Sequence, residues 1–503
     1  MQFQNPIIRG FHPDPSVCVV GEDYYLVTSS FEYLPGVPLF HSRDLVHWEQ
    51  IGHCLTRESQ IDLAGSRCSG GIFAPTLRYH EGRFYMITTN IAKGNFFVTA
   101  DDICGEWSEP VWVDVMGIDP SLFWEDGKTY MQLSSRDEKG CVILQCEIDT
   151  VSGEILNGPR EISRGCGGRD AEAPHLYYKD GYYYLLLAEG GTREGHMVTV
   201  SRSRSIWGPF EPCPHNPVLS NRDCGQEPLQ CVGHADLFCD RFGTWWMAAL
   251  AVRPVKHRHT LGRETVLVPA VWTREQWPAA RDGYAALTVK VEGRDAICEE
   301  VCQTLTNIPA VDDFNGEKLL PCYNFMRSFL RGQYRLETGK CYLKGNRYSL
   351  NDLESPAFVA RVLEDYRFTL ETLVSFSPKS EEEEAGLALY MDTAHHMDFV
   401  VTLRNGKRVV LLRKNVSDIK VEEGIRELPE QAESIRLTIR GDETWYTFFG
   451  QIGQEEPVCV GRTVISHLAT ECADSAFTGV YGGMYVFGEG TEAVYDYLRL
   501  ESN

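Results

Sequence analysis

Residues 181–186 read Gly-Tyr-Tyr-Tyr-Leu-Leu, a glycine followed at once by an aromatic and apolar run. The same pattern recurs four more times before residue 250. The further copies are Gly21-Glu-Asp-Tyr-Tyr-Leu-Val, Gly82-Arg-Phe-Tyr-Met-Ile, Gly127-Lys-Thr-Tyr-Met and Gly243-Thr-Trp-Trp-Met-Ala. Each copy is typical of the second strand of a β-hairpin whose turn contains the glycine.

The spacing of these copies indicates how the strands are grouped. Successive glycines lie 61, 45, 54 and 62 residues apart, which is enough for a unit of several strands. Repeated units of this size predict the blades of a β-propeller, so five copies predict five blades. Nothing before residue 290 has the pattern of a long, capped amphipathic helix. We therefore expect an all-β, five-bladed propeller over residues 1–295.

A second set of residues recurs in phase with these glycines. We expect the first strand of each hairpin to end seven to nine residues before its glycine, at Asp14-Pro15-Ser16, Ala74-Pro75-Thr76, Asp119-Pro120-Ser121, Glu172-Ala173-Pro174 and His234-Ala235-Asp236. First strands line the channel of a propeller, so equivalent positions should converge. Aspartate before proline is also a common turn residue, so a structural role could explain Asp14 and Asp119. It would not explain why a glutamate and a histidine occupy the equivalent positions of two other repeats. Converging titratable side chains predict a functional site.

The chain changes character near residue 290, where the glycine-aromatic repeat stops. The segment 290–311 has the composition of a linker. Beyond it, polar and apolar residues alternate between turns such as Asn405-Gly406, which predicts a β-sandwich over residues 310–503. We expect the acidic run 381–384 to be a solvated loop, and His395-His396 to lie on the surface without a role.

Composition restricts the partners and the compartment. The formal net charge of −23 repels nucleic acid and anionic membranes, and favours a small neutral substrate. No run reaches the ~18 apolar residues of a membrane span, and no signal peptide is visible at the N-terminus. The 17 cysteines have no repeated short spacing, so we expect buried reduced thiols and a cytoplasmic location. Cys298 and Cys302 lie four residues apart, but the second pair that a metal site needs is missing.

Several longer stretches resemble glycoside hydrolase family 43, in particular its two-domain β-xylosidases and α-L-arabinofuranosidases. The matching stretches are NPIIRGFHPDPS (5–16), SGGIFAPTLRYH (69–80), GIDPSLFWEDGK (117–128), AEAPHLYYKDGYYYLLLAEGGT (171–192), GHADL (233–237) and LGRET (261–265). DDFNG, LESPAFVARV and EEAGLALYM extend the similarity into the second domain, so it covers nearly the whole chain.

The resemblance implies roles for the recurring motif residues. It makes Asp14 the general base, Glu172 the general acid, and Asp119 the residue that orients the acid and tunes its pKa. It also implies that Arg263 contacts the terminal sugar. His234 is placed near the channel centre, where some relatives hold a cation, often calcium, through water.

The resemblance also implies how the sugar is enclosed. Phe31 and Phe73 are expected to pack against the apolar face of the sugar, with Ala74 beside them. Close xylosidase relatives have tryptophan at the position of Phe73, which leaves the identity of the pentose open. In the two-domain relatives a loop of the second domain covers the channel mouth and contributes a phenylalanine. The candidate is Phe477, although its segment 475–490 also fits a core strand with a glycine turn.

Together these features predict an exo-acting, inverting hydrolase that releases a terminal pentose without a cofactor. Glu172 must be protonated and Asp14 ionised, with the carboxyl groups about 6.5–9.5 Å apart to leave room for a water. We expect a β-D-xylosidase acting on xylo-oligosaccharides, with an α-L-arabinofuranosidase or bifunctional enzyme as the alternative. A non-catalytic carbohydrate-binding propeller is a further alternative, and a retaining fructan- or sucrose-cleaving hydrolase is disfavoured because its motifs differ. Assembly into a homo-oligomer is left open.

Overall fold

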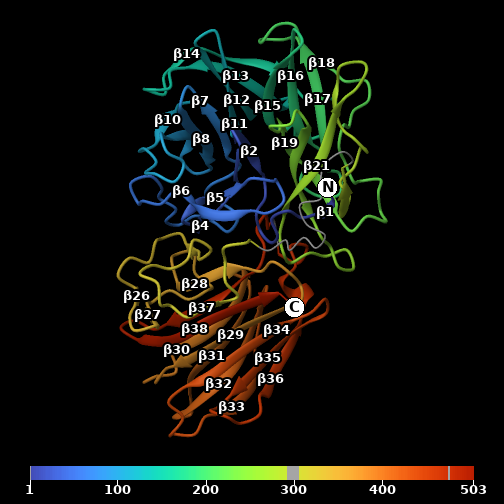
Figure 1. The fold of residues 1–503 in the computed structure, drawn as a ribbon. Coiled ribbons are helices and arrows are strands. Elements are labelled where there is room, and N and C mark those ends of the chain that lie inside the picture. The colour runs from blue at the N-terminus through green and yellow to red at the C-terminus, as the bar shows by residue number, and fades with distance from the viewer. Residues whose placement is uncertain (1, 292–304, 474–475, 503) are drawn as a thin grey trace.

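The computed structural model describes residues 2–291, 305–473 and 476–502. Figure 1 shows two all-β bodies, a propeller drawn in blue to yellow-green and a sandwich drawn in yellow to red. The predicted fold class is confirmed. The sole helical element within the described ranges is the short 3-10 helix η1 (Ile465–Leu468). No helix in that part of the chain combines the length and the apolar composition that a membrane span requires.

Five four-stranded antiparallel sheets form the blades of the propeller. Blade 1 contains β2 (Ser16–Val20), β3 (Asp23–Val27), β5 (Gly36–Ser42) and β6 (Glu49–Leu55). Blade 2 contains β7 (Thr76–His80), β8 (Arg83–Asn90), β9 (Gly94–Ala100) and β10 (Val111–Val113). Blade 3 contains β11 (Ile118–Glu125), β12 (Lys128–Asp137), β13 (Gly140–Ile148) and β14 (Ile155–Ser163).

The last two blades complete a ring. Blade 4 contains β15 (Glu172–Lys179), β16 (Tyr182–Glu189), β17 (Met197–Ser203) and β18 (Glu211–Pro212). Blade 5 contains β19 (Gln230–Cys239), β20 (Trp245–Val252), β21 (Glu264–Trp272) and β22 (Pro278–Ala280). Strands β2, β7, β11, β15 and β19 each contact the next one around the ring, and β19 contacts β2. The first strand of each blade therefore lines the central channel.

The five repeated glycines lie in turns, as predicted. They precede β3, β8, β12, β16 and β20, and their φ angles of +61° to +86° favour glycine because a side chain would be strained there. The prediction for the first strands was wrong in one respect. Because short turns join the strands, each first strand runs up to its turn. The motif residues lie at or just before its beginning in blades 1 to 4 and in the middle of β19 in blade 5, rather than at its end.

The N-terminal segment closes the propeller ring. Strand β1 (Gln2–Gln4) pairs with β23 (Thr288–Lys290), which follows the last blade. The Asn5 side chain then spans to blade 5: its amide donates to the Leu267 carbonyl at 3.0 Å, and its oxygen accepts from the Leu267 N–H at 2.8 Å. Residues from the two ends of the domain thus satisfy one another's backbone groups, which fixes blade 1 against blade 5.

A buried carboxylate ties four blades together inside the channel. Asp236 of β19 forms an ion pair with Arg78 of β7 at 2.8 Å. It also accepts hydrogen bonds of 2.7 Å from the Ser16 hydroxyl of β2 and from the Tyr177 hydroxyl of β15. Burial alone would raise the pKa of Asp236, but Arg78, His175 and Ser16 hold it below its usual range. The ionised carboxylate therefore links blades 1, 2, 4 and 5.

The second domain is a sandwich of two antiparallel sheets. One sheet has the order β26 (Tyr334–Leu336), β27 (Cys341–Lys344), β38 (Glu492–Ser502), β29 (Phe368–Ser375), β34 (Ile435–Gly441), β35 (Trp445–Gln451) and β36 (Val458–Val464), with β24 (Val311–Asp312) against β38. The other has the order β28 (Ala357–Val362), β37 (Tyr481–Phe487), β30 (Glu384–Asp392), β31 (His395–Arg404), β32 (Lys407–Val416) and β33 (Ile419–Glu427). Apolar side chains of both sheets form one core.

Some polar residues of the sandwich lie deeper than predicted. His395 and His396 are buried in β31, and the Nδ1 atom of His396 lies 2.6 Å from the Asp398 carboxylate. Glu384, expected in a solvated loop, is the first residue of β30 and is buried in an ion pair with Arg413. Each buried group has a charged partner, which offsets the cost of losing water.

The cysteines of the described residues are all free thiols, as expected. However, Cys104, Cys459 and Cys472 are exposed rather than buried. Each lies in a surface turn or an edge strand, where no core surrounds it. Cys298 and Cys302 lie outside the described residues.

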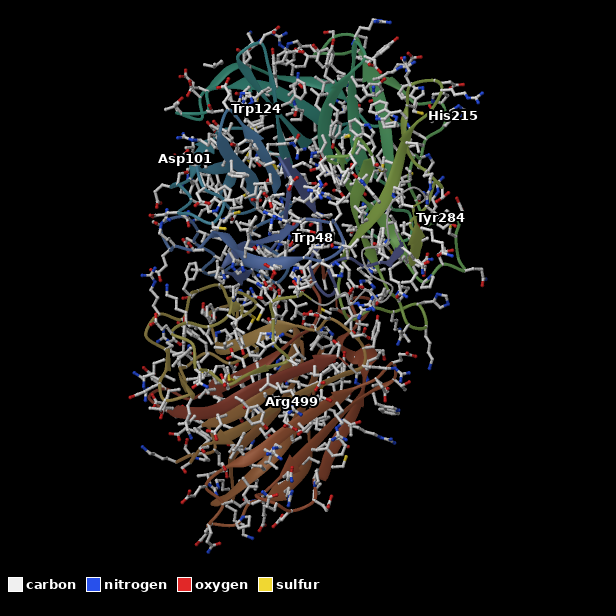
Figure 2. All side chains as sticks on the ribbon, in the orientation of Figure 1. Trp48, Asp101, Trp124, His215, Tyr284 and Arg499 are labelled. Atoms are coloured by element: carbon white, nitrogen blue, oxygen red, sulfur yellow. The ribbon has the colours of Figure 1, made fainter. Side chains whose placement is uncertain are left out.

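The two domains are joined by backbone pairing. Strand β4 (Tyr33–Leu34) of the propeller pairs with β25 (Phe325–Met326) of the second domain. The Val480 N–H donates to the Thr260 carbonyl at 2.8 Å, and the Thr306 N–H donates to the Trp48 carbonyl at 3.0 Å. Trp48, labelled in Figure 2, lies in the half of the propeller nearer the sandwich. The sandwich is therefore bonded to blade 1 and to the loop before blade 5's third strand.

Replacing Asp236 by asparagine should lower the free energy of unfolding of the propeller by about 3–5 kcal/mol, because Arg78 would keep an unpaired buried charge. Urea unfolding followed by tryptophan fluorescence measures this. Asp101→Asn is the matched control, since Asp101 lies at the surface in an exposed pair with Arg83 (Figure 2) and its loss should cost less than about 1 kcal/mol. Equal stability of the two variants would contradict the role given to Asp236.

Candidate active site

Irregularities of the inner strands beside the motifs orient the motif side chains. The register shifts between β11 and β12, between β15 and β16, and between β19 and β20, in each case beside the motif. Residues in the left-handed region at these points are Asp14 (φ 56°), Asp119 (54°), Ala173 (51°) and His234 (49°). A bulge turns a side chain away from the regular alternation of a strand. Non-glycine residues held in this region cost energy and cluster at functional sites.

Asp14 is held as an ionised carboxylate. It is only 4% exposed, and its two oxygens accept from the Arg263 guanidinium at 2.9 and 3.3 Å. The Ser29 hydroxyl donates to the same carboxylate at 2.6 Å, and His234 Nδ1 lies 3.5 Å away. Burial alone would raise the pKa of Asp14, but Arg263, His234 and Ser29 together lower it. The carboxylate can therefore accept a proton.

Glu172 is held in the opposite state. Burial first, and the charge of Asp14 second, raise the pKa of Glu172 to about 7, although Arg263 opposes the shift. Burial and the charge of Glu172 also raise the pKa of Asp119 well above its usual range. Two buried carboxyls that repel each other titrate as a pair, so the pair retains a proton near neutral pH. Asp119, the negative neighbour to which the sequence pointed, is coupled to Glu172, and Asp14 adds a second negative charge.

Asp119 also contributes to the geometry of blade 4. One of its carboxylate oxygens accepts a hydrogen bond from the Ala173 N–H at 3.3 Å. Ala173 is the left-handed residue directly after Glu172. Asp119 therefore fixes the backbone that carries Glu172, in addition to its electrostatic effect.

Aromatic rings from both domains lie beside the carboxylates. The ring of Phe31 is 5.2 Å from that of Phe73 and 6.0 Å from that of Phe477. The Arg263 guanidinium lies 5.6 Å from the ring centroids of Phe31 and Phe477. Ala74, which is buried, precedes β7 at the ring position that carries carboxylates in blades 1, 3 and 4. Of the residues predicted to contact the sugar, Phe31 and Phe477 lie beside Arg263 and Phe73 lies beside Phe31. Ala74 and His234 lie at the motif positions of blades 2 and 5.

Phe477 reaches the site from the second domain. It precedes β37, so the segment 475–490 contains both of the predicted features, a loop at the site and a core strand from Tyr481 onwards. Residue 475 itself lies outside the described residues. The Phe477 carbonyl accepts a hydrogen bond from Arg263 Nε at 3.3 Å. The same arginine therefore contacts both Asp14 and the loop of the sandwich.

His234 is the residue to which a cation was assigned. It is 6% exposed, and burial lowers its pKa, so the imidazole is neutral near neutral pH. Calcium prefers oxygen ligands, so the imidazole suits a cation held through water rather than directly. Across the described part of the chain, no group of three or more His, Cys, Asp or Glu side chains is arranged to hold a metal ion. The calcium ion stays a prediction.

Sequence reasoning missed three hydroxyl side chains at the site. Ser29 donates to Asp14, the Thr192 hydroxyl accepts from Arg263 at 3.3 Å, and the Ser69 hydroxyl accepts from the Phe477 N–H at 2.8 Å. Ser69 and Thr192 lie at the ends of stretches that carry the family resemblance. Serine and threonine are so common in turns, however, that their type alone signals nothing.

An ionised carboxylate and a protonated carboxyl on different blades, beside aromatic walls, form the site of a glycoside hydrolase. The chain belongs to glycosyl hydrolases family 43, whose family model matches residues 3–278. The model of the beta xylosidase C-terminal concanavalin A-like domain matches residues 311–501. The family and the enzyme class predicted from the sequence are confirmed.

Individual relatives agree over almost the full length. A non-reducing end alpha-L-arabinofuranosidase of Bacteroides ovatus is 41% identical over 505 residues, with 97% of this chain and 92% of the relative covered. A beta-xylosidase of Bacillus subtilis is 33% identical, with 91% and 90% covered. Among solved structures, the GH43B protein of a Bacteroides ovatus xyloglucan locus has a TM-score of 0.94 at 39% identity, with all of both chains covered. The xylan beta-1,4-xylosidase of Bacillus halodurans has a TM-score of 0.92 at 33% identity, with 99% and 100% covered.

The pH dependence of kcat/KM should follow these pKa shifts. Activity should fall as the pH rises through about 7, because Glu172 then loses its proton. On the acid side it should persist below the usual aspartate range, because the pKa of Asp14 is lowered and the base stays ionised. Steady-state rates on an aryl pentoside at closely spaced pH values measure both limbs. A basic limb near pH 4–5, the ordinary glutamate range, would contradict the analysis.

Proposed function

We propose that this protein is an inverting, exo-acting glycosidase that removes one terminal pentose at a time, with the β-D-xylosides of xylo-oligosaccharides as its principal substrates. The observation that carries the proposal is the opposite protonation of two carboxyl groups in one site. Asp14 is kept ionised by Arg263 and Ser29, while the pKa of Glu172 is raised to about 7. One group can take a proton while the other gives one.

The reaction follows from these two states. Glu172 donates its proton to the glycosidic oxygen as the bond from that oxygen to the anomeric carbon breaks. A water molecule attacks the anomeric carbon from the opposite face, and Asp14 accepts the proton that this water loses. The two carboxyl groups then exchange protons with solvent to restore the starting state. A single displacement inverts the anomeric configuration, and no step requires a cofactor.

The remaining residues support these two. Asp119 holds the backbone after Glu172 and keeps a proton on the carboxyl pair. Arg263 stabilises the charge of Asp14 and lies beside two aromatic rings, Phe31 and Phe477, that can pack against the apolar face of a sugar. A cation near His234, held through water, would add positive charge beside Asp14 and takes part in no bond change.

Exo-action is supported by the position of the second domain. Phe477 is contributed by the sandwich and lies against Arg263 and beside Phe31 of the propeller. A site covered on one side by another domain admits the end of a chain more readily than its middle. A small neutral substrate also suits a protein with a formal net charge of −23.

A second candidate substrate is an α-L-arabinofuranoside. It is favoured by the 41% identity to a relative named for that activity. It is also favoured by Phe73, which stands where close xylosidase relatives have tryptophan, because a smaller ring leaves room for a different pentose. The non-catalytic binding propeller is not supported, because a binding module has no need of carboxyls in opposite states.

A comparison of two aryl glycosides tests the proposal. Para-nitrophenyl β-D-xylopyranoside should be hydrolysed with a higher kcat/KM than para-nitrophenyl α-L-arabinofuranoside. Equal kcat/KM values on the two substrates would indicate a bifunctional enzyme. A strong preference for the arabinofuranoside would select the second candidate. Turnover of neither substrate would contradict the proposed function.

The acid and the base can be separated by the leaving group. Glu172→Gln should lose about 10²–10⁴-fold in kcat on xylobiose, whose leaving oxygen needs a proton, and much less on an aryl glycoside that leaves readily. Asp14→Asn should lose activity on both substrates alike, because each needs the activated water. Equal losses for Glu172→Gln on the two substrates would contradict its role as the acid.

A further inference from the structure

A buried serine of the propeller holds the aromatic residue contributed by the sandwich. The Ser69 hydroxyl accepts a hydrogen bond of 2.8 Å from the backbone N–H of Phe477. The Ser69 N–H in turn donates to both oxygens of the Glu32 carboxylate, at 3.1 and 3.0 Å. Ser69 is 2% exposed and Glu32 is fully buried. The position of Phe477 therefore depends on a serine that is itself fixed by a buried carboxylate.

The loop that carries Ser69 is also bonded to the aromatic wall of the site. Ile72 and Phe31 exchange two backbone hydrogen bonds, of 2.8 and 3.0 Å. At Gly71, whose φ is +85°, an added Cβ would lie 2.2 Å from the Phe31 carbonyl oxygen, so only glycine permits this close approach. The loop 66–71 therefore moves together with Phe31, and it places Phe477 at a fixed distance from that ring.

An arginine of the second domain holds the same loop from the other side. Arg327 directly follows β25, which pairs with β4, and β4 lies at the edge of the propeller that faces the sandwich (Figure 1). The Arg327 N–H donates to the Glu32 carbonyl at 2.9 Å. Its Nε donates to the Ser66 carbonyl at 2.7 Å, and its Nη2 lies 3.4 Å from Cys68 Sγ. Arg327 thus contacts both ends of the network, Glu32 through its backbone N–H and the loop of Ser69 through its side chain.

These contacts are more specific than an ordinary domain interface requires. A carboxylate that is fully buried costs free energy, and apolar groups of similar volume often fill such a place with no loss of stability. Burial raises the pKa of Glu32, while the charge of Arg327 opposes that shift. An apolar residue in place of Glu32 could not accept the hydrogen bond from the Ser69 N–H. It would therefore orient neither Ser69 nor, through Ser69, Phe477.

We propose that Glu32, Ser69 and Arg327 are positioning residues that hold Phe477 over the sugar, so that the sandwich sets the dimensions of the site through a propeller loop as well as through its own loop. The inference rests on the proposed function, in which Phe477 closes the site around a terminal sugar. None of the three residues contacts Asp14 or Glu172 through a described hydrogen bond or ion pair, so they should act on substrate binding more than on the chemical step.

The test is a double-mutant cycle between Ser69 and Phe477. Ser69→Ala removes the acceptor of the Phe477 N–H and should raise KM for xylobiose about three- to tenfold, with kcat changed less than twofold. Phe477→Ala should raise KM further. The double variant should be no worse than Phe477→Ala alone, because Ser69 acts through Phe477. An unchanged KM in Ser69→Ala, a parallel loss of kcat, or additive losses in the double variant would overturn the proposal.

Conservative variants separate positioning from general destabilisation. Glu32→Gln keeps an oxygen that can accept from the Ser69 N–H and should retain a KM within about twofold of wild type, whereas Glu32→Leu should raise it as Ser69→Ala does. Arg327→Met should raise KM in the same way. Its matched control is Arg426→Met, because Arg426 donates to the Gly450 carbonyl at 2.7 Å from β33, at the far end of the sandwich (Figure 1). That control should leave KM unchanged.

Different results would contradict the proposed function and the positioning role. Wild-type protein is first assayed on the aryl glycosides, and absence of turnover there contradicts the proposed function. Wild-type turnover with an unaltered KM in Ser69→Ala contradicts only the positioning role. Thermal unfolding of each variant identifies any that do not fold, and Ser69→Ala, which removes a single oxygen atom, decides the question if Arg327→Met or Glu32→Leu is among them.

Discussion

The site depends on the buried ion pair between Asp14 and Arg263. A carboxylate that is 4% exposed would otherwise be protonated, and a protonated Asp14 could not accept a proton from water. Together with burial, the same charge raises the pKa of Glu172. Arg263 therefore sets the state of the base directly and, by keeping the base ionised, sets the state of the acid across the ring.

The fold supplies the positions on which this pair depends. Asp14 comes from blade 1, Glu172 from blade 4 and Arg263 from the segment before the third strand of blade 5, so no local stretch of chain could bring them together. The buried Asp236 links four blades inside the channel and so fixes their relative positions. The sandwich adds Phe477 from the other side, and its contact with Arg263 joins the second domain to the same electrostatic centre.

Much of this arrangement could be predicted from the sequence because a propeller repeats. Five turn glycines revealed five blades, and residues in phase with them revealed a ring of motif positions that includes Asp14, Asp119, Glu172 and His234. The bounds of the first strands could not be predicted correctly, because the phase of a motif does not tell where its strand begins and ends. Ser29, Ser69 and Thr192 escaped notice, since their value lies in partners distant in the chain. The burial of His396 could not be predicted, because it depends on the position of β31 between β30 and β32 in the sheet.

The central claim is that water attacks directly, with Asp14 as base and Glu172 as acid. Proton NMR of the anomeric signals during the first minutes of hydrolysis of a β-D-xyloside tests it most directly, before mutarotation mixes the products. The account predicts that α-xylose appears first and that the β-anomer grows only later. Initial release of β-xylose would mean retention through a covalent intermediate, and would contradict the roles given to Asp14 and Glu172.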